Sequence, residues 1–180
     1  LPEAMTDLES EPLRVRDGFG DSPMGRLLLQ SRQLVEQGVR FVTVNTFAKL
    51  EGERTWDAHG CTTSAPATVF DYHSWIGPQF DRAVAALLDD LTDRGLLDST
   101  LVVCAGEIGR TPLMNSGGGR DHWTQAFSGL LFGGETHPGT VIGRTSVHGG
   151  EVLEAPLPLE SLADQMLAFL GLSNARSEAF

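Results

Sequence analysis

Carboxylate and imidazole side chains occur together at two places in the chain, and each place follows a run of residues with high β propensity. The first is Trp56-Asp-Ala-His-Gly60, in which one residue separates Asp57 from His59. Residues i and i+2 of an extended segment point the same way, so both side chains can reach one ion. Carboxylate oxygen and imidazole nitrogen bind zinc, manganese or iron, whereas carboxylates alone suit calcium or magnesium. The alternative is that both residues make hydrogen bonds within a turn.

The second place begins with Glu107, which ends the apolar run from Leu101. A continuous apolar run between turn residues is typical of a strand buried on both faces, so we predict a strand over residues 100–105. Ligands of open α/β sheets bind just beyond the carboxyl ends of the strands. A glutamate cannot be buried there unpaired without a large cost. It is therefore either paired with Arg110 or Arg120, or bound to a metal ion.

Asp121 and His122 stand side by side behind the glycine-rich loop Gly117-Gly-Gly119. Glycines allow backbones to approach closely, so this loop can bring both side chains to a metal ion. A capping aspartate and a surface histidine are the alternative. Arg110 and Arg120 can bind an oxyanion such as phosphate or sulfate by bidentate hydrogen bonds, or can simply tie the loops down.

The elements that must position these residues alternate between helical and β-type segments, which predicts an α/β fold. Ser22-Pro23 is a helix start and Gly38 a helix stop, and a strand is predicted directly afterwards over residues 40–46. A second helical region runs from about residue 67 to residue 94, with a break near Gly77.

The rest of the chain divides into shorter segments. In chain order we predict a loose arm over residues 1–21, a strand over 126–132, a hairpin or edge pair of 140–142 with 151–153, a helix over 158–170 and a tail over 173–180. One domain would then span residues 22–172. The start at Leu1 rather than at a methionine suggests a fragment or a processed product.

Composition excludes several classes of protein. A formal charge of −11 and a pI of about 4.7 argue against a nucleic-acid partner, which usually meets a basic face. They do not exclude an anionic substrate, because a bound cation reverses the local field. No apolar run approaches the length of about 20 residues that a membrane span needs. The two cysteines, Cys61 and Cys104, fit neither a metal motif nor a disulfide framework.

Several segments taken together resemble the DUF1501 family, a group of sulfatase-like proteins assigned to the alkaline phosphatase superfamily. The resemblance covers roughly residues 18–172 and is specific because the motifs occur in the family's order. These motifs are Trp56-Asp-Ala-His-Gly60, Leu101-Val-Val-Cys-Ala-Gly-Glu-Ile-Gly-Arg-Thr-Pro112, Gly119-Arg-Asp-His-Trp123 and Phe127-Ser-Gly-Leu-Leu-Phe-Gly-Gly134.

The resemblance implies a three-layer α/β/α fold of the alkaline-phosphatase type, with a mostly parallel sheet and divalent metal ions at the strand ends. Asp57 and His59 would be the first ligand set, and Glu107 would stand where the superfamily usually has an aspartate. His122 would be the late histidine ligand, with Asp121 as a further ligand or as its orienting partner. The resemblance also implies a periplasmic or cell-surface location.

Two departures limit this reading. Ile108 stands where the superfamily usually has a second histidine ligand, which argues against a complete two-metal site. The superfamily's nucleophile comes from an N-terminal half that this sequence does not contain, so no catalytic nucleophile is assigned and the chain is expected to be catalytically incomplete.

Three hypotheses about function follow. The first is a hydrolase-like domain that uses zinc, manganese, calcium or magnesium to act on a small phosphate or sulfate ester, or on a sulfated or phosphorylated glycan. The second is a non-catalytic, metal-stabilised domain that binds a glycan or a protein. The third is a metal-free structural domain in which Glu107 pairs with an arginine. Ester turnover separates the first two hypotheses, and metal content separates both from the third.

Overall fold

The computed structural model describes residues 6–47, 49, 52–60, 63–134, 136–154 and 156–172. The chain divides into two compact units. Unit 1 comprises Leu1–Leu96 with Met114–Arg120, and unit 2 comprises Leu97–Leu113 with Asp121–Phe180. Within the described part of the chain, no helix is both long and apolar enough to cross a membrane.

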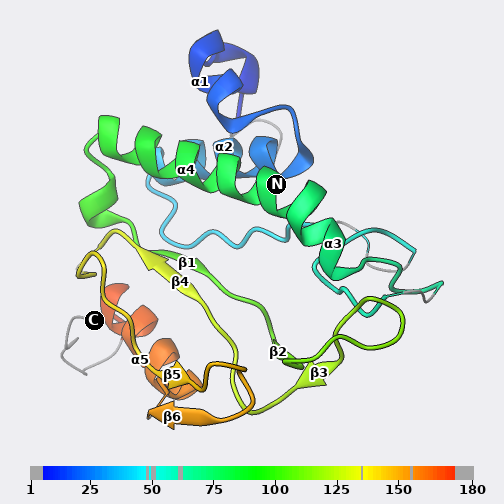
Figure 1. Ribbon diagram of the computed structural model, residues 1–180. Coiled ribbons are helices and arrows are strands. Elements are labelled where there is room, and N and C mark those ends of the chain that lie inside the picture. Colours follow the sequence, from blue (N-terminus) through cyan, green and yellow to red (C-terminus); the bar gives the residue numbers. More distant parts are fainter. Residues whose placement is uncertain are drawn as a thin grey trace. The chain divides into compact units, whose positions relative to one another are not determined.

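Unit 1 is built from helices, of which the two longest run side by side (Figure 1). In chain order the helices are η2 (Leu8–Ser10), α1 (Leu13–Phe19), α2 (Pro23–Glu36), α3 (Val69–Asp71), the π-helical turn η3 (Tyr72–Ile76) and α4 (Gly77–Asp93). Helix α1 also packs against α2 and α4. Residues 1–21 were expected to be a loose arm. That prediction is wrong for residues 8–19, because α1 buries Phe19 in the core.

The ends of α2 are as the sequence predicts. The Ser22 hydroxyl accepts a hydrogen bond from the backbone N–H of Gly25 at 3.0 Å, and Pro23 occupies the first turn, where its missing N–H costs nothing. Gly38 ends the segment at φ +86°, a left-handed conformation that favours glycine.

The predicted break near Gly77 is a π-helical turn rather than a gap between helices. Helix α3, η3 and α4 follow one another without interruption, and Pro78 lies in the first turn of α4. A Cβ atom at Gly77 would lie 2.3 Å from the carbonyl oxygen of Tyr72, so only glycine fits the bulged backbone. Asp71 completes a capping box with Thr68, and the backbone hydrogen bond from Thr68 lowers the pKa of Asp71.

The hydrophobic core lies in unit 1, where α2 and α4 each contribute one apolar face. Helix α4 buries Val84, Leu87 and Leu91 at the predicted helical spacing. The other buried apolar side chains come from α1, α2, η3 and the loop between α2 and α3. The full set is Phe19, Met24, Leu29, Leu34, Ala58, Ala65, Ala67, Ile76, Ala83, Val84, Leu87 and Leu91.

A buried arginine joins three segments of this core. The side chain of Arg32 is fully buried, and its guanidinium lies 2.5 Å from Glu11, 2.6 Å from Glu36 and 2.6 Å from Asp90. Arg94 pairs with the same three carboxylates at 2.8 to 3.2 Å. Asp90 lies in α4 and is largely buried, with only 10% of its side chain exposed.

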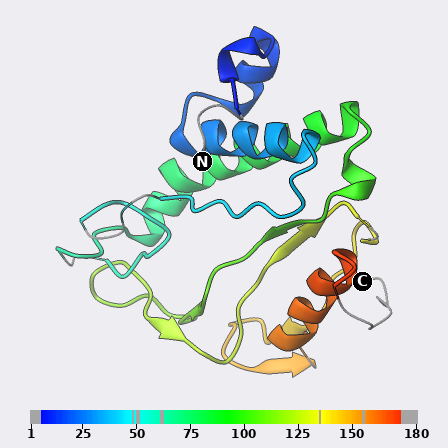
Figure 2. The same ribbon diagram turned by 180° about the vertical axis from the view of Figure 1, so that it is seen from behind.

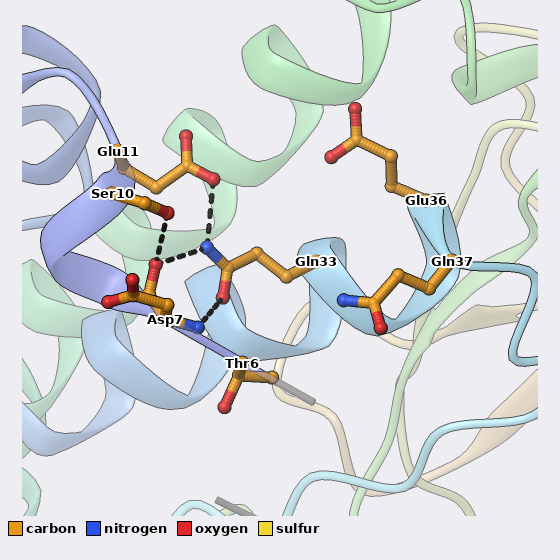
Figure 3. A pocket seen from close by; sticks show the side chains of 7 residues that line it. All are labelled: Thr6, Asp7, Ser10, Glu11, Gln33, Glu36 and Gln37. Atoms are coloured by element: carbon orange, nitrogen blue, oxygen red, sulfur yellow. Dashed lines mark hydrogen bonds between the residues drawn. The ribbon is translucent and has the colours of Figure 1, made fainter. Parts of the chain in front are cut away.

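A polar pocket lies beside this ion-pair network, between the N-terminal segment and α2 (Figure 3). The Gln33 amide spans it: the nitrogen donates to the Asp7 carbonyl at 2.8 Å and to Glu11 at 2.9 Å, while the oxygen accepts from the Asp7 N–H at 3.1 Å. The pocket is lined by Thr6, Asp7, Ser10, Glu11, Gln33, Glu36 and Gln37. These hydrogen bonds hold the N-terminal segment against α2.

In the described residues of unit 2 the strands form three short antiparallel pairs. Figure 2 shows the same ribbon from behind, with the C-terminal helix in orange and red. Strand β1 (Val102–Cys104) pairs with β4 (Leu130–Phe132), β2 (Gly109–Arg110) with β3 (His122–Trp123), and β5 (Arg144–Thr145) with β6 (Val152–Glu154). The turn η4 (Leu97–Ser99) precedes β1, and α5 (Leu159–Phe169) follows β6. Helix α5 confirms the helix predicted over residues 158–170.

The predicted mostly parallel sheet of a three-layer fold is not found among the described residues. Parallel neighbours need a crossover connection, usually a helix, but the chain between β1 and β4 is a glycine-rich loop with a hairpin. The chain therefore returns antiparallel, and the fold is mixed α/β. Strand β1 is half-exposed rather than buried on both faces. Residues 40–46 form no strand, because β propensity alone does not supply a partner strand.

Candidate metal centre

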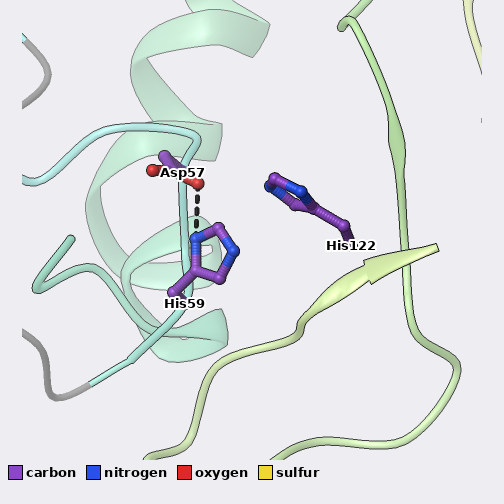
Figure 4. A group of neighbouring side chains, drawn as sticks. All are labelled: Asp57, His59 and His122. Carbon is purple, nitrogen blue, oxygen red and sulfur yellow. Dashed lines mark ion pairs between the residues drawn. The ribbon is translucent and has the colours of Figure 1, made fainter.

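Asp57 and His59 lie on one tight turn in unit 1 and contact each other (Figure 4). Asp57 Oδ1 lies 2.6 Å from His59 Nδ1, and 35% and 27% of the two side chains are exposed. The turn is closed by i to i+2 hydrogen bonds: Ala58 N–H donates to the Trp56 carbonyl at 2.9 Å and His59 N–H to the Asp57 carbonyl at 3.1 Å. The predicted alternation of Asp57 and His59 onto one side is thus confirmed, in a turn rather than in a strand end.

The flanking residues anchor this turn to the helical core. Ala58 is 1% exposed, and buried Thr55 accepts a hydrogen bond from the Asp57 N–H at 3.1 Å. The Trp56 ring lies 5.3 Å from that of Tyr72 and 5.5 Å from that of Phe80, in an edge-to-face arrangement with Phe80. The Tyr72 hydroxyl donates to the Trp56 carbonyl. Trp56 is therefore a core anchor.

The glycine loop over residues 115–120 packs directly against the turn, backbone to backbone. The Arg120 N–H donates to the Ala58 carbonyl at 2.8 Å. A Cβ atom at Gly119 would lie 2.1 Å from the carbonyl carbon of His59, and one at Gly60 would lie 2.5 Å from the carbonyl oxygen of Gly117. Side chains at either position would separate the two segments. The sequence-based expectation that these glycines allow close approach is confirmed.

In unit 2, His122 and Arg110 lie on neighbouring strands. The two residues are direct partners in the antiparallel ladder of β2 and β3, so their side chains lie on the same face. Asp121 immediately precedes β3, and its N–H donates to the Thr111 hydroxyl at 3.2 Å while its carbonyl accepts from the Thr111 N–H at 2.9 Å. The structure therefore brings an arginine and a histidine together on one short hairpin.

Glu107 lies on the turn between β1 and β2 and is exposed. Burial therefore does not force Glu107 to bind a metal ion or an arginine, because an exposed carboxylate is solvated by water.

The other chemically interesting side chains are placed as follows. Trp123 is half-buried on β3. His73, His137 and His148 are exposed. Burial raises the pKa of the Cys104 thiol, which fits the behaviour of a small hydrophobic residue. Cys61 lies outside the described residues.

Sequence reasoning missed Asn115, whose side chain connects the glycine loop to the turn. Its Nδ2 donates to the His59 carbonyl at 2.9 Å, and its Oδ1 accepts from the N–H groups of Gly117 and Gly119 at 3.0 Å each. The local signal was an asparagine followed by a run of glycines, which is typical of a side chain that bonds to the backbone two residues on. The contact with His59 spans 56 residues and has no local signal.

Comparison with known proteins gives one match. A family model described as "Protein of unknown function (DUF1501)" matches residues 2–179. The chain belongs to the DUF1501 family. For this DUF1501 chain, searches of curated proteins and of solved structures found no match.

Proposed function

We propose that Asp57 and His59 hold a divalent metal ion, with His122 as a further ligand predicted from the sequence, in a hydrolase-like domain that acts on phosphate or sulfate esters. The observation that carries this proposal is the contact of 2.6 Å between Asp57 and His59. Both side chains are about one-third exposed, so an ion and a substrate can reach them. Their backbone is anchored on both sides, which preserves the geometry when the ion is absent.

The chain path supports His122 as the third ligand. Arg120 is hydrogen-bonded through its backbone to Ala58, the residue between Asp57 and His59. His122 follows Arg120 by two residues, which allows at most about 7 Å between their Cα atoms. Covalent connection alone therefore keeps the His122 imidazole in the neighbourhood of the turn.

The donor atoms narrow the choice of metal. Two imidazoles and one carboxylate suit zinc or manganese, whereas calcium and magnesium prefer shells made of oxygen atoms. A bound ion of this kind would polarise an ester oxygen. In this assignment zinc and manganese are favoured over calcium and magnesium, and a set of three protein ligands leaves a position for substrate.

The two arginines supply the charge that a phosphate or sulfate group needs. Arg110 stands opposite His122 in the β2–β3 ladder, and the Arg120 backbone is fixed beside the Asp57–His59 turn. A guanidinium binds two oxyanion oxygens at once.

Glu107 and Asp121 remain predicted ligands. The conservative variants Glu107→Gln and Asp121→Asn test them, and a loss of metal affinity in either variant would add that residue to the site.

Oxyanion binding to the metal-loaded protein tests the proposal. We expect inorganic phosphate or sulfate to bind to the protein loaded with zinc or manganese, and to bind at least about tenfold more weakly to Arg110→Ala, because a bidentate charged contact is lost. Arg144→Ala is the matched control, since Arg144 is exposed on β5 and pairs with Glu154 at 2.8 Å. Equal oxyanion binding with and without the metal would contradict the proposal.

A second function is supported by one feature of the sequence. Ile108 takes the position of a histidine ligand in the resembled superfamily, which leaves fewer donors for a catalytic centre. A metal-stabilised domain that binds a glycan or a protein fits this loss. Turnover of 4-nitrophenyl phosphate or 4-nitrophenyl sulfate that depends on the metal would favour the hydrolase, and metal binding with oxyanion affinity but no turnover would favour the binding domain.

A further inference from the structure

Asn115 uses both ends of its carboxamide at the edge of the candidate centre. The nitrogen donates to the carbonyl of His59 at 2.9 Å, and the oxygen accepts from the N–H groups of Gly117 and Gly119 at 3.0 Å each. One side chain therefore closes the glycine loop and fastens it to the residue next to the Asp57 contact. Asn115 is half-buried, so these hydrogen bonds are partly shielded from water.

The loop satisfies its own backbone groups around this side chain. The Asn115 N–H donates to the Gly119 carbonyl at 2.9 Å, and the Gly118 N–H donates to the Asn115 carbonyl at 3.1 Å. The carboxamide oxygen thus occupies the space that the loop's N–H groups could offer to an anion. The requirement is specific to asparagine, because aspartate has the acceptor but not the donor, and alanine has neither.

The closed loop determines where the chain leaves the turn. Gly119 sits against the backbone of His59, and Arg120 then donates to the Ala58 carbonyl at 2.8 Å. Asp121 and His122 follow immediately along the chain. A loop that is not closed by Asn115 would release Gly119 and Arg120 from the turn, and with them the start of the segment that carries His122.

We propose that Asn115 is a positioning residue of this centre, which holds residues 117–120 on the Asp57–His59 turn and so fixes the backbone of His59. The proposal rests on the metal site proposed above. It adds a role to a residue that does not itself bind the ion. The contact that carries it is the hydrogen bond from Asn115 to the His59 carbonyl.

Three variants test the role of Asn115. Asn115→Ala removes all three hydrogen bonds, Asn115→Asp keeps the two acceptor bonds and loses the donor, and Ser116→Ala is the control at the exposed neighbouring position. We expect Asn115→Ala to weaken zinc or manganese binding about 10- to 100-fold, the usual effect of removing a group that orients a ligand. Asn115→Asp should bind with intermediate affinity, and Ser116→Ala should match the wild type.

Two further measurements separate positioning from general loosening. Hydrogen exchange at the N–H groups of Gly117, Gly119 and Arg120 should accelerate in Asn115→Ala, while exchange in α4 stays unchanged. The imidazole NMR signals of His59 should shift in the same variant without added metal, and should not shift in Ser116→Ala.

Each result either supports or overturns the positioning role of Asn115. Wild-type affinity in Asn115→Ala, with faster loop exchange, would overturn the positioning role and leave Asn115 as a loop residue only. If the wild type binds no metal, the proposed function fails, and the His59 signals still decide this inference: a shift of these signals in Asn115→Ala supports it, and unchanged signals overturn it.

Discussion

The contact between Asp57 Oδ1 and His59 Nδ1 fixes the orientation of the His59 imidazole. At 2.6 Å the carboxylate engages Nδ1, and a carboxylate on one ring nitrogen sets the tautomer of the ring. Asp57 can then act in two ways, as a ligand itself or as the partner that orients the imidazole. Both arrangements require the Asp57 carboxylate. They differ in how much of the affinity for the metal ion depends on it.

Substitutions at these two residues separate the arrangements. We expect His59→Ala to abolish measurable metal binding, because it removes a ligand. Asp57→Asn should weaken binding about 10- to 100-fold if Asp57 orients His59. Competition with a chromophoric chelator measures both affinities, and His73→Ala, an exposed histidine of the same unit, is the control. Unchanged affinity in His59→Ala would contradict the assignment.

Glu11 gives unit 1 a pH dependence. Burial would raise its pKa, but hydrogen bonds from Arg32 and Gln33 and the charges of Arg32 and Arg94 outweigh burial, so the folded-state pKa is lowered from 4.5. A lowered pKa means that the ionised form stabilises the folded state. This contribution is complete above the unfolded-state pKa and is lost as the pH falls through the folded-state value.

Replacing Glu11 with glutamine tests this contribution. We expect Glu11→Gln to lower the free energy of unfolding at neutral pH by about 1–3 kcal/mol, and to lose less stability than the wild type between neutral pH and acid. Glu9→Gln is the control, because 84% of the Glu9 side chain is exposed although it also pairs with an arginine. Urea unfolding at several pH values measures both variants, and parallel pH profiles of Glu11→Gln and the wild type would be inconsistent with the lowered pKa.

At the scale of elements, the glycine loop and the Asp57–His59 turn depend on close backbone contact. Gly119→Ala would place a methyl group 2.1 Å from a carbonyl carbon, which the backbones can relieve only by separating. We expect the variant to lose several kcal/mol of stability and most of its metal affinity. Gly150→Ala, with no atom within 4 Å of the added Cβ, should behave like the wild type in thermal unfolding and in metal titration. Wild-type stability and metal affinity in Gly119→Ala would show that this backbone contact is dispensable.

The elements differ in how far the sequence predicts them. Helices α2 and α5 were predicted because their caps and apolar periodicity are local properties of the chain. Strand pairing was not predicted correctly, because it depends on which distant segment lies beside a strand. Residues 40–46 have high β propensity but form no strand, and β1 pairs with β4 in the antiparallel direction. The Asp57–His59 contact followed from spacing, whereas the Asn115 bond to His59 joins residues far apart in sequence.

At the scale of the whole molecule, the two units differ in their cores. The buried apolar side chains of the described chain lie in unit 1, whereas α5 and the strands of unit 2 contain no buried apolar side chain. Short two-stranded pairs are marginally stable in water. Burial of apolar surface is the main favourable term in folding, so unit 1 has the greater local stability.

Hydrogen exchange tests this difference between the units. We expect the amides of α2 and α4 to exchange slowest, at rates set by global unfolding, and those of β5 and β6 to exchange at least about a hundredfold faster. The expected difference corresponds to about 2.7 kcal/mol of opening free energy. Uniform protection across both units would show that unit 2 is stabilised by interactions other than a buried apolar core.

The most direct test of the central claim is the metal content of the purified chain, measured by elemental analysis before and after chelation, with a thermal melt of each sample. We predict about one tightly bound zinc or manganese ion per chain, a lower melting temperature after chelation, and loss of the ion in His59→Ala and His122→Ala but not in His73→Ala. A native chain without metal, and with no stabilisation by added zinc, manganese, calcium or magnesium, would contradict the account.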